Sequence, residues 1–226
     1  MSKLRAGRTH VALLESADRR GTNDFSFIAL GARDIIEVRD GKYRGKAVTD
    51  PLVPFESIIK PSTGERSRLS MGYIGFLSYE STRFFEPIPL TPNPNVPDAL
   101  FFLPEVILRI DHTERTVELI AHHDTKEDLD ALEQIVMESP FFDDAKEKQF
   151  RSIALPEKED IESYRTISSA AYIAQVETLK EAIRAGETFQ VVLGQELRVP
   201  TTIDPLLVYR ELRSINPSDR KSTRLN

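Results

Sequence analysis

The sequence contains no cysteine. This absence excludes disulfide bonds, thiolate metal sites and a cysteine nucleophile, although it says little about the cellular compartment. No apolar run approaches the roughly 20 residues that a membrane-spanning helix needs. The opening MSKLRAGRTH lacks the apolar core of a secretory signal. We therefore expect a cytoplasmic protein.

Basic residues are fewer than acidic ones, and the formal net charge is −6. A chain of this sign argues against nonspecific binding to nucleic acid, which needs a basic surface. The 226 residues, of which 40% are hydrophobic and 29% charged, are typical of a soluble globular protein with one large or two small domains. Phosphate-binding glycine loops and serine–histidine–acid signatures are missing, and the four histidines lack a metal-ligand spacing.

Short apolar runs separated by turns fill the first two thirds of the chain. Their patterns predict strands at His10–Ser16, Phe25–Leu30, Asp34–Arg39, Tyr43–Val48, Met71–Glu80, Ala99–Ile110 and Arg115–His122. Asp40-Gly41 is a strong hairpin-turn signal, and the proline-rich connector Pro87–Pro97 is incompatible with regular helix or central strand. Short strands joined by tight turns predict antiparallel sheets.

Helices are expected at the periphery of these sheets. Asp50-Pro51 predicts the start of a short helix that ends before Pro61. Thr125–Asp128 resembles a capping box that opens a second helix. Asp204-Pro205 caps the last one. We therefore expect an α+β fold of mostly antiparallel sheets with peripheral helices, in which residues 1–150 form the N-terminal region.

The most informative stretch is Tyr172–Leu197, YIAQVETLKEAIRAGETFQVVLGQEL. Apolar residues recur at helical spacing at Ile173, Val176, Leu179 and Ile183. Ser168 or Ser169 is expected to cap this helix, and Gly186 to end it. A strand with one core face and one polar face, the latter including Gln190 and Gly194, is predicted to follow. An ordinary strand with one wet face is the alternative to a functional surface.

Residues 185–197, AGETFQVVLGQEL, closely resemble the run AGDIFQVVLSQR at the start of the chorismate-binding domain in the anthranilate synthase component I family. Gly194 and Glu196 depart from the family's serine and arginine. Two earlier motifs occur in the family's order: LLES at Leu13–Ser16, and GFLSYESTRFFE at Gly75–Glu86, which is similar to GYFGYDTVRYFE. In the second motif we expect Tyr79, Arg83 and Glu86 to be structural, with an Arg–Glu surface pair.

The resemblance also implies how the chain is divided. Residues 164–218 correspond to the start of the chorismate-binding domain, so the chain is expected to be truncated before the catalytic half. The final DRKSTRLN, residues 219–226, resembles a translated sequencing-adapter tail, and we expect it to be foreign. The fragment alone is therefore expected to be inactive.

Enzymes of the resembled family convert chorismate and ammonia to anthranilate and pyruvate in tryptophan biosynthesis, and this lyase reaction is what the resemblance implies. It implies a glutamine amidotransferase partner (component II) that supplies ammonia, and Mg²⁺ held by glutamates that lie beyond this chain. It also implies feedback inhibition by tryptophan bound at Glu15 and Ser16. A hydroxyl both donates and accepts hydrogen bonds, and a carboxylate favours a ligand ammonium. Alternatively, LLES is only two core leucines and a solvated strand end.

Gln190 is the catalytic candidate on the substrate-pocket side. Related chorismate enzymes that add water have a lysine at the matching position, and a glutamine amide cannot titrate. Gln190 therefore fits an enzyme whose nucleophile is ammonia, although a glutamine that bonds a neighbouring strand is the alternative. Two other functions stay open: aminodeoxychorismate synthase component I, which shares the fold and substrate, and a noncatalytic tryptophan-binding regulatory fragment.

Overall fold

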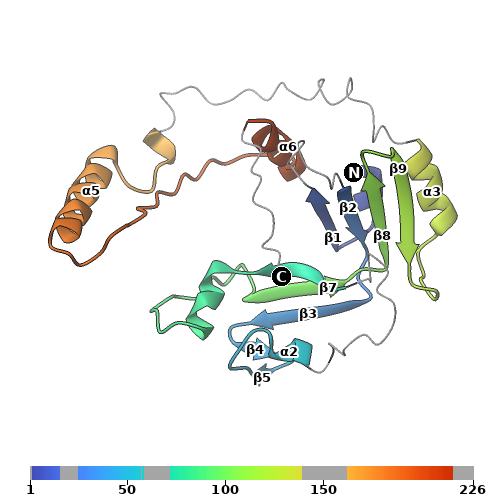
Figure 1. Cartoon of the computed structure of the whole chain (residues 1–226), viewed down its shortest axis with the longest axis horizontal. Helices are drawn as coiled ribbons and strands as arrows, with labels where there is room; N and C mark the ends of the chain where they lie inside the picture. Colours follow the sequence, from blue (N-terminus) through green and yellow to red (C-terminus); the bar gives the residue numbers. More distant parts are fainter. Residues whose placement is uncertain (1, 16–24, 57, 59–71, 139–161, 216–226) are drawn as a thin grey trace. The chain divides into compact units, whose positions relative to one another are not determined.

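The computed structural model describes residues 2–15, 25–56, 58, 72–138 and 162–215 (Figure 1). The chain divides into two compact units, with the division after Asp143. Their described parts are residues 2–138 and 162–215, and each is treated by itself below. Across these ranges, none of the helices is both long and apolar enough to cross a membrane.

Two antiparallel sheets form the first unit, as expected for an α+β fold. The four-stranded sheet has the order β1-β2-β8-β9, and the five-stranded sheet has the order β5-β4-β3-β7-β6. The strands of the first sheet are β1 (Val11–Glu15), β2 (Phe25–Leu30), β8 (Val106–Asp111) and β9 (Thr116–Ala121). Those of the second are β3 (Asp34–Arg39), β4 (Lys42–Tyr43), β5 (Lys46–Ala47), β6 (Ile74–Leu77) and β7 (Ala99–Leu103).

Each face of the four-stranded sheet packs on a different partner. One face is covered by α1 (Ser2–Arg5) and α3 (Leu129–Met137), which place Leu4 and Leu132 on the buried side chains of β2 and β8. The other face meets the five-stranded sheet, where Ala29 and Ile107 contact Phe102 of β7. Because side chains alternate along a strand, the two clusters assign every residue of these strands to a face.

The strand predicted for Ala99–Ile110 is in fact two strands in different sheets. β7 pairs with β3 and β6, whereas β8 pairs with β2 and β9. The break lies at Pro104, which is buried and has no N–H for a strand ladder. The predicted strands Ala99–Ile110 and Arg115–His122 would form a hairpin over the turn at His112–Glu114, and in the structure β8 and β9 alone form it.

Two other strand predictions were too long. The return strand expected at Tyr43–Val48 is interrupted by a second tight turn, in which Arg44 and Gly45 have φ values of 49° and 80°. The strand expected at Met71–Glu80 is limited to β6 within the described residues, and a 3-10 helix, η1 (Tyr79–Phe84), follows it. Gly75 is required in β6, since a Cβ there would lie 1.9 Å from the carbonyl oxygen of Leu100.

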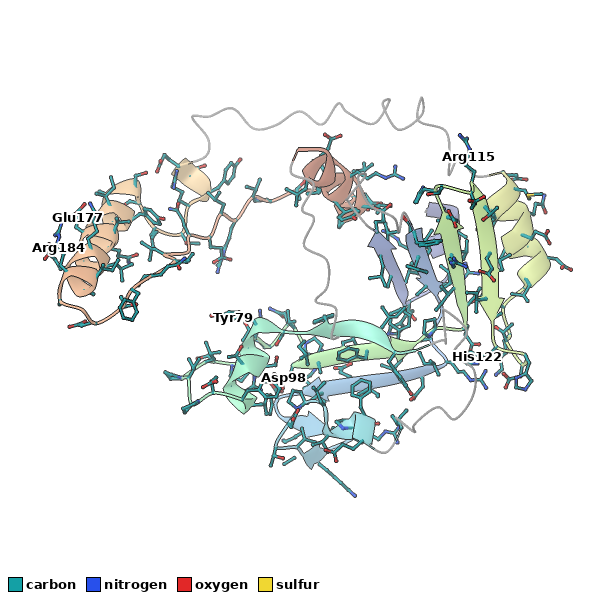
Figure 2. The ribbon with its side chains drawn as sticks, viewed as in Figure 1. Tyr79, Asp98, Arg115, His122, Glu177 and Arg184 are labelled. Atoms are coloured by element: carbon teal, nitrogen blue, oxygen red, sulfur yellow. The ribbon has the colours of Figure 1, made fainter. Side chains whose placement is uncertain are left out.

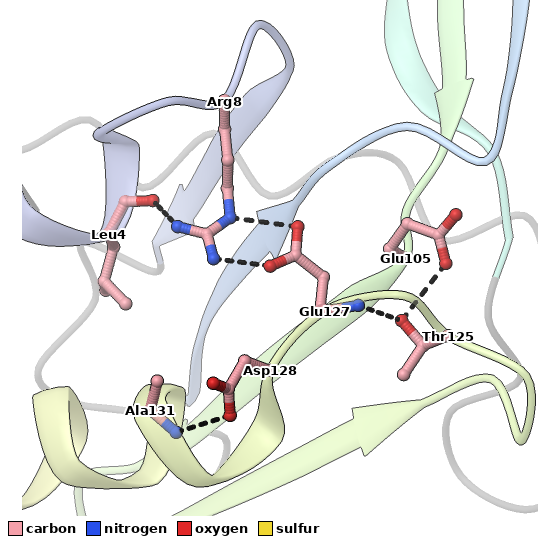
Figure 3. Close-up of polar contacts among 7 residues, drawn as sticks. All are labelled: Leu4, Arg8, Glu105, Thr125, Glu127, Asp128 and Ala131. Carbon is pink, nitrogen blue, oxygen red and sulfur yellow. Dashed lines mark hydrogen bonds and ion pairs between the residues drawn. The ribbon is translucent and has the colours of Figure 1, made fainter.

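Helix α2 (Val53–Glu56) is a single turn, whereas α3 begins three residues later than the capping-box prediction. Asp128 is the N-cap, and its carboxylate accepts a hydrogen bond from the Ala131 amide at 3.0 Å (Figure 3). The expected acidic partner in the capping box, Asp128, is thus itself the N-cap, and Glu127 forms an ion pair with Arg8, with a closest contact of 2.5 Å. Thr125 donates a hydrogen bond to Glu105 at 3.2 Å. This network joins the segment after α1 to the loop before α3.

The second unit contains α5 (Ser169–Arg184) and α6 (Pro205–Ile215). Ser168 caps α5, because its hydroxyl accepts a hydrogen bond from the Ala171 amide at 3.2 Å. Gly186 has a φ of 79°, and its amide and that of Glu187 donate to carbonyls of the last turn, which is a Schellman motif. At the start of α6, Asp204 accepts from the Leu206 amide at 2.9 Å, as its proline-flanked position predicted.

The strand predicted for Phe189–Leu197 does not form. This segment makes only an isolated antiparallel bridge between Leu197 and Arg165. A strand requires a neighbour that pairs with its backbone N–H and C=O groups, and among the described residues only 164–166 provide one, at its very end. The prediction of an extended, two-faced strand was therefore wrong for this structure.

Candidate functional site

The end of β1 brings together three polar residues of the four-stranded sheet. Glu15 lies opposite Ser26 of β2 in the register, on the face that α1 and α3 cover. Ser26 is 2% exposed and lies 2.8 Å from the Nε2 atom of His112, which follows β8. A half-buried carboxylate thus lies beside a buried hydroxyl that pairs with a half-buried imidazole. Ser16, the other residue predicted here, lies outside the described residues.

A second set of side chains lies on the opposite face at the same end. Leu14, Phe27, Arg109 and Glu118 face one another across the four strands in one register row. Arg109 donates to Glu118 at 3.0 Å, and its guanidinium carbon lies 4.4 Å from the ring centroid of Phe25. The Phe25 and Phe27 rings stack with centroids 6.4 Å apart. Leucine, phenylalanine and a charge pair thus share one partly exposed surface.

No local sequence pattern singles out this row. Arg109 and Glu118 belong to the predicted hairpin strands, but the predicted strand that contains Arg109 runs across Pro104. Counting outward from the turn that joins β8 to β9 would have paired Arg109 with Glu118, since the register there runs from Asp111↔Thr116. The positions of Leu14 and Phe27 beside them depend on nonlocal pairing that no local pattern contains.

Gln190 lies in the unpaired segment that follows α5. Gln190 is exposed, and its backbone carbonyl accepts a hydrogen bond from the Thr188 hydroxyl at 3.3 Å. Its neighbours are also solvated, with Phe189 100% exposed and Val192 86% exposed. Glu15 belongs to the first unit, so Gln190 is described here only within the second.

A shallow groove of about 260 Å³ lies between α5 and the same segment. Its walls are mostly apolar, from Tyr172, Val176, Leu179, Lys180, Ile183, Val191 and Leu193. The Tyr172 hydroxyl donates to the Leu193 carbonyl at 3.3 Å, which holds the segment against the helix. Figure 2 shows Glu177 and Arg184 on the helix, where they pair with Lys180 and Glu181. Of the titratable side chains in its lining, Tyr172 donates to a carbonyl and Lys180 pairs with Glu177.

The motif around Arg83 is structural, but its ion pair differs from the prediction. Arg83 contacts the carboxylate of Asp98 at 2.7 Å rather than Glu86. Asp98 is 3% exposed, and its other oxygen accepts from the Gly41 amide at 2.8 Å. Tyr79, at the start of η1, is 79% exposed (Figure 2). Arg83 and Asp98 thus join η1 to the hairpin turn between β3 and β4.

Within the part of the chain that the structure describes, no three His, Asp or Glu side chains converge to hold a metal ion. The Mg²⁺ that the resemblance implies therefore has no ligand set among these described residues.

Comparisons with known proteins agree with these elements over nearly the whole chain. The family model described as "chorismate binding enzyme" matches residues 9–223. The probable anthranilate synthase component 1 of Schizosaccharomyces pombe is 31% identical over 96% of this chain and 45% of its own length. Anthranilate synthase component 1 of Thermus thermophilus is 31% identical over 91% of this chain and 46% of its own.

A solved structure gives the same answer for the fold. The crystal structure of anthranilate synthase component I from Streptococcus pneumoniae aligns with a TM-score of 0.59 and 27% identity, over 96% of this chain and 50% of that one. The chain thus spans about half the length of the relatives that it matches. The family match covers both units, and the chain therefore belongs to the chorismate binding enzyme family.

Proposed function

We propose that this chain is part of an anthranilate synthase component I. That enzyme converts chorismate and ammonia to anthranilate and pyruvate in the cytoplasm. The observation that carries the proposal is the similarity of residues 9–223 to the family, together with relatives of that name that align over more than nine tenths of the chain. Ammonia comes from glutamine through a partner amidotransferase subunit, component II. The reaction requires Mg²⁺, and tryptophan inhibits it by binding at the end of β1, around Glu15 and Ser16.

In this proposal Gln190 is a substrate-pocket residue. A glutamine amide has no titratable proton, so it cannot activate water as a lysine could. This chemistry is consistent with attack by ammonia, which already carries a lone pair. The exposed position of Gln190 beside the groove leaves its amide accessible to a substrate once a further protein surface covers the segment.

We further propose that the 226-residue chain alone forms no anthranilate. None of the described residues 162–212 is buried, so the α5 segment has no enclosed site in which a reaction could exclude water. Mixing the purified chain with chorismate, ammonium and Mg²⁺ tests this by the fluorescence of anthranilate. Turnover by the chain alone would refute it.

A chimera tests the activity itself. Residues 9–215 of this chain would replace the aligned segment of the Thermus thermophilus relative, and the products would be separated by chromatography. Anthranilate that forms only with Mg²⁺ supports the proposal. Loss of turnover in the chimera, while the unaltered relative stays active, would count against the proposal. In the chimera, Gln190→Lys should lower ammonia-dependent turnover. The unaltered Thermus thermophilus relative is the positive control for the assay.

A further inference from the structure

A glutamine interrupts the apolar face of the segment that follows α5. Gln195 lies on the side of residues 189–197 where the other positions are apolar, namely Phe189, Val191, Leu193 and Leu197. Within this range only Leu193 and Gln195 are partly buried, whereas Phe189 is 100% exposed. A polar side chain that is less exposed than its apolar neighbours needs hydrogen-bond partners, because a buried amide without them is costly.

The Gln195 amide is bonded at both of its ends to the chain just before α5. Its Oε1 atom accepts a hydrogen bond from Nη1 of Arg165, and its Nε2 atom donates to the Ile167 carbonyl at 3.2 Å. Arg165 is held in turn by Glu162, whose carboxylate lies 3.0 Å from the Nε atom of Arg165. A glutamine amide can accept and donate at once, whereas an ionised carboxylate only accepts and an apolar side chain does neither. The residue type at position 195 therefore matches this bridge.

Backbone hydrogen bonds run beside the Gln195 bridge. The Thr166 amide donates to the Glu196 carbonyl at 3.2 Å, and the Arg198 amide donates to the Tyr164 carbonyl at 2.9 Å. These two bonds and the Gln195 bridge join the chain before α5 to the chain after it, and we call them together the clasp.

The chain is held on both sides of Gln190. On one side, the Schellman motif at Gly186 ends α5. On the other side, the Tyr172 hydroxyl donates to the Leu193 carbonyl at 3.3 Å, and the clasp follows directly. A short length of chain whose two ends are held has fewer backbone conformations than one with a free end. The clasp thus restricts where the Gln190 amide can lie.

We propose that Arg165 and Gln195 are positioning residues for the reaction, which act through the backbone to set the place of Gln190. The proposal rests on the proposed function in one respect, since it takes Gln190 as a residue of the substrate pocket. Arg165 and Gln195 themselves are assigned no contact with the substrate. Loss of the clasp would therefore free the segment without removing a group that touches chorismate or ammonia.

Hydrogen exchange of the purified 226-residue chain tests the clasp itself. Gln195→Leu continues the apolar alternation of the segment but removes both hydrogen bonds of the amide. We expect the protection factor of the Thr166 amide to fall by about tenfold, because a hydrogen bond to a charged group is lost. Arg165→Gln should lower it by a similar factor.

Arg198→Gln is the matched control for these variants. Arg198 pairs with Glu196 of its own segment at 2.9 Å, and both side chains are more than half exposed. The substitution leaves the Arg198 backbone amide and the Gln195 bridge in place. Protection of the Thr166 amide should therefore change little.

Turnover by the chimera tests whether the clasp acts through Gln190. Gln195→Leu and Arg165→Gln should each lower kcat/KM for ammonia by about tenfold. In a chimera that already has Gln190→Ala, Gln195→Leu should cause no further loss, because there is no longer an amide to position. Losses from independent structural roles would instead add.

Two results would overturn the proposal. The first is unchanged Thr166 protection in both Gln195→Leu and Arg165→Gln, which would show that the clasp does not hold the segment. The second is a full additional loss from Gln195→Leu in the Gln190→Ala chimera, which would give the clasp a role unrelated to Gln190. An inactive chimera with neither substitution would overturn the proposed function and with it the role of Gln190, whereas Thr166 exchange in the chain would still decide the clasp.

Discussion

At the scale of single residues, Asp98 is the buried carboxylate among the described residues of the first unit. Its carboxylate is almost completely buried and is compensated by Arg83 on one oxygen and by the Gly41 amide on the other. Arg83 is itself held in place, since its guanidinium lies 4.5 Å from the ring centroid of Phe84 and donates to the Glu80 carbonyl. A buried charge of this kind is tolerated only while its partners remain.

Asp98→Ala should therefore destabilise the first unit strongly. Removing one member of a buried ion pair leaves the other charge desolvated, which typically costs about 3–5 kcal/mol. Urea unfolding followed by circular dichroism measures the loss. Glu37→Ala is the control, because the Glu37–Arg39 pair is more than 40% exposed on both sides and should change stability by only about 0–1 kcal/mol. A loss for Asp98→Ala as small as that of the control would contradict the role given to Asp98.

Tyr73 provides a pH-dependent test. Burial, together with a 2.5 Å hydrogen bond to Asp34, raises the pKa of Tyr73 from 10.0 to about 12. Since the pKa is higher in the folded state, the stabilisation is complete below the unfolded value and is lost as the pH rises through about 12. In an ultraviolet titration of phenolate, Tyr73→Phe should remove a step near pH 12. A titration curve whose final step between pH 10 and 12 is unchanged by Tyr73→Phe would rule out this assignment.

At the scale of elements, α5 is defined by its ends more than by its packing. It has no buried residue, yet Ser168 caps its start and Gly186 closes its last turn. Propensity and capping thus carry much of its local stability, because helices otherwise depend on tertiary packing of an apolar face.

Ser168→Ala should accordingly unfold part of α5. Loss of an N-cap hydroxyl typically costs about 1 kcal/mol. Ser169→Ala is the control, since Ser169 is the first helical residue and its hydroxyl donates to Glu162 instead of capping an amide. Amide exchange over Ala170–Val176 should accelerate in the first variant and change little in the second. Equal acceleration in both variants would place the cap elsewhere.

The elements that could be predicted from the sequence are those set by local signals. The bounds of β2 and β3, the hairpin at Asp40-Gly41, and the serine cap and glycine end of α5 all follow from side-chain alternation or turn chemistry. The break at Pro104 was also readable in principle, since proline interrupts a central strand.

Other features depend on contacts between residues far apart in the chain. The Arg83–Asp98 pair and the Leu14–Phe27–Arg109–Glu118 row exist only once the sheet order is known. The absent strand at Phe189–Leu197 has the same cause, because its alternating pattern is real but a strand also needs a partner. For the same reason the sequence motif identifies Gln190 as a candidate but does not assemble a site around it.

At the scale of the whole molecule, the two units differ in the core that each possesses. The first has two hydrophobic clusters centred on Leu108 and Ile107, with many side chains below 5% exposure. In the second, no residue between 162 and 212 is buried, and the apolar groove along α5 is open to solvent. Burial of apolar surface is the main source of folding stability, so the two units should open with different free energies.

Hydrogen exchange of the intact chain measures this difference. Amides of β2 and β8, in the centre of the four-stranded sheet, should exchange slowest, through global unfolding. Those of α5 should exchange by local fraying with little protection, because a helix of 16 residues is marginal in water without packing. In the chimera, we expect the rest of the Thermus thermophilus relative to cover this face, so that protection of Val176, Leu179 and Ile183 rises by about tenfold or more, equivalent to about 1.4 kcal/mol. Equal protection of α5 in the chain and the chimera would show that its apolar face needs no partner, and the structural basis for assigning it to a larger substrate-binding domain would be lost.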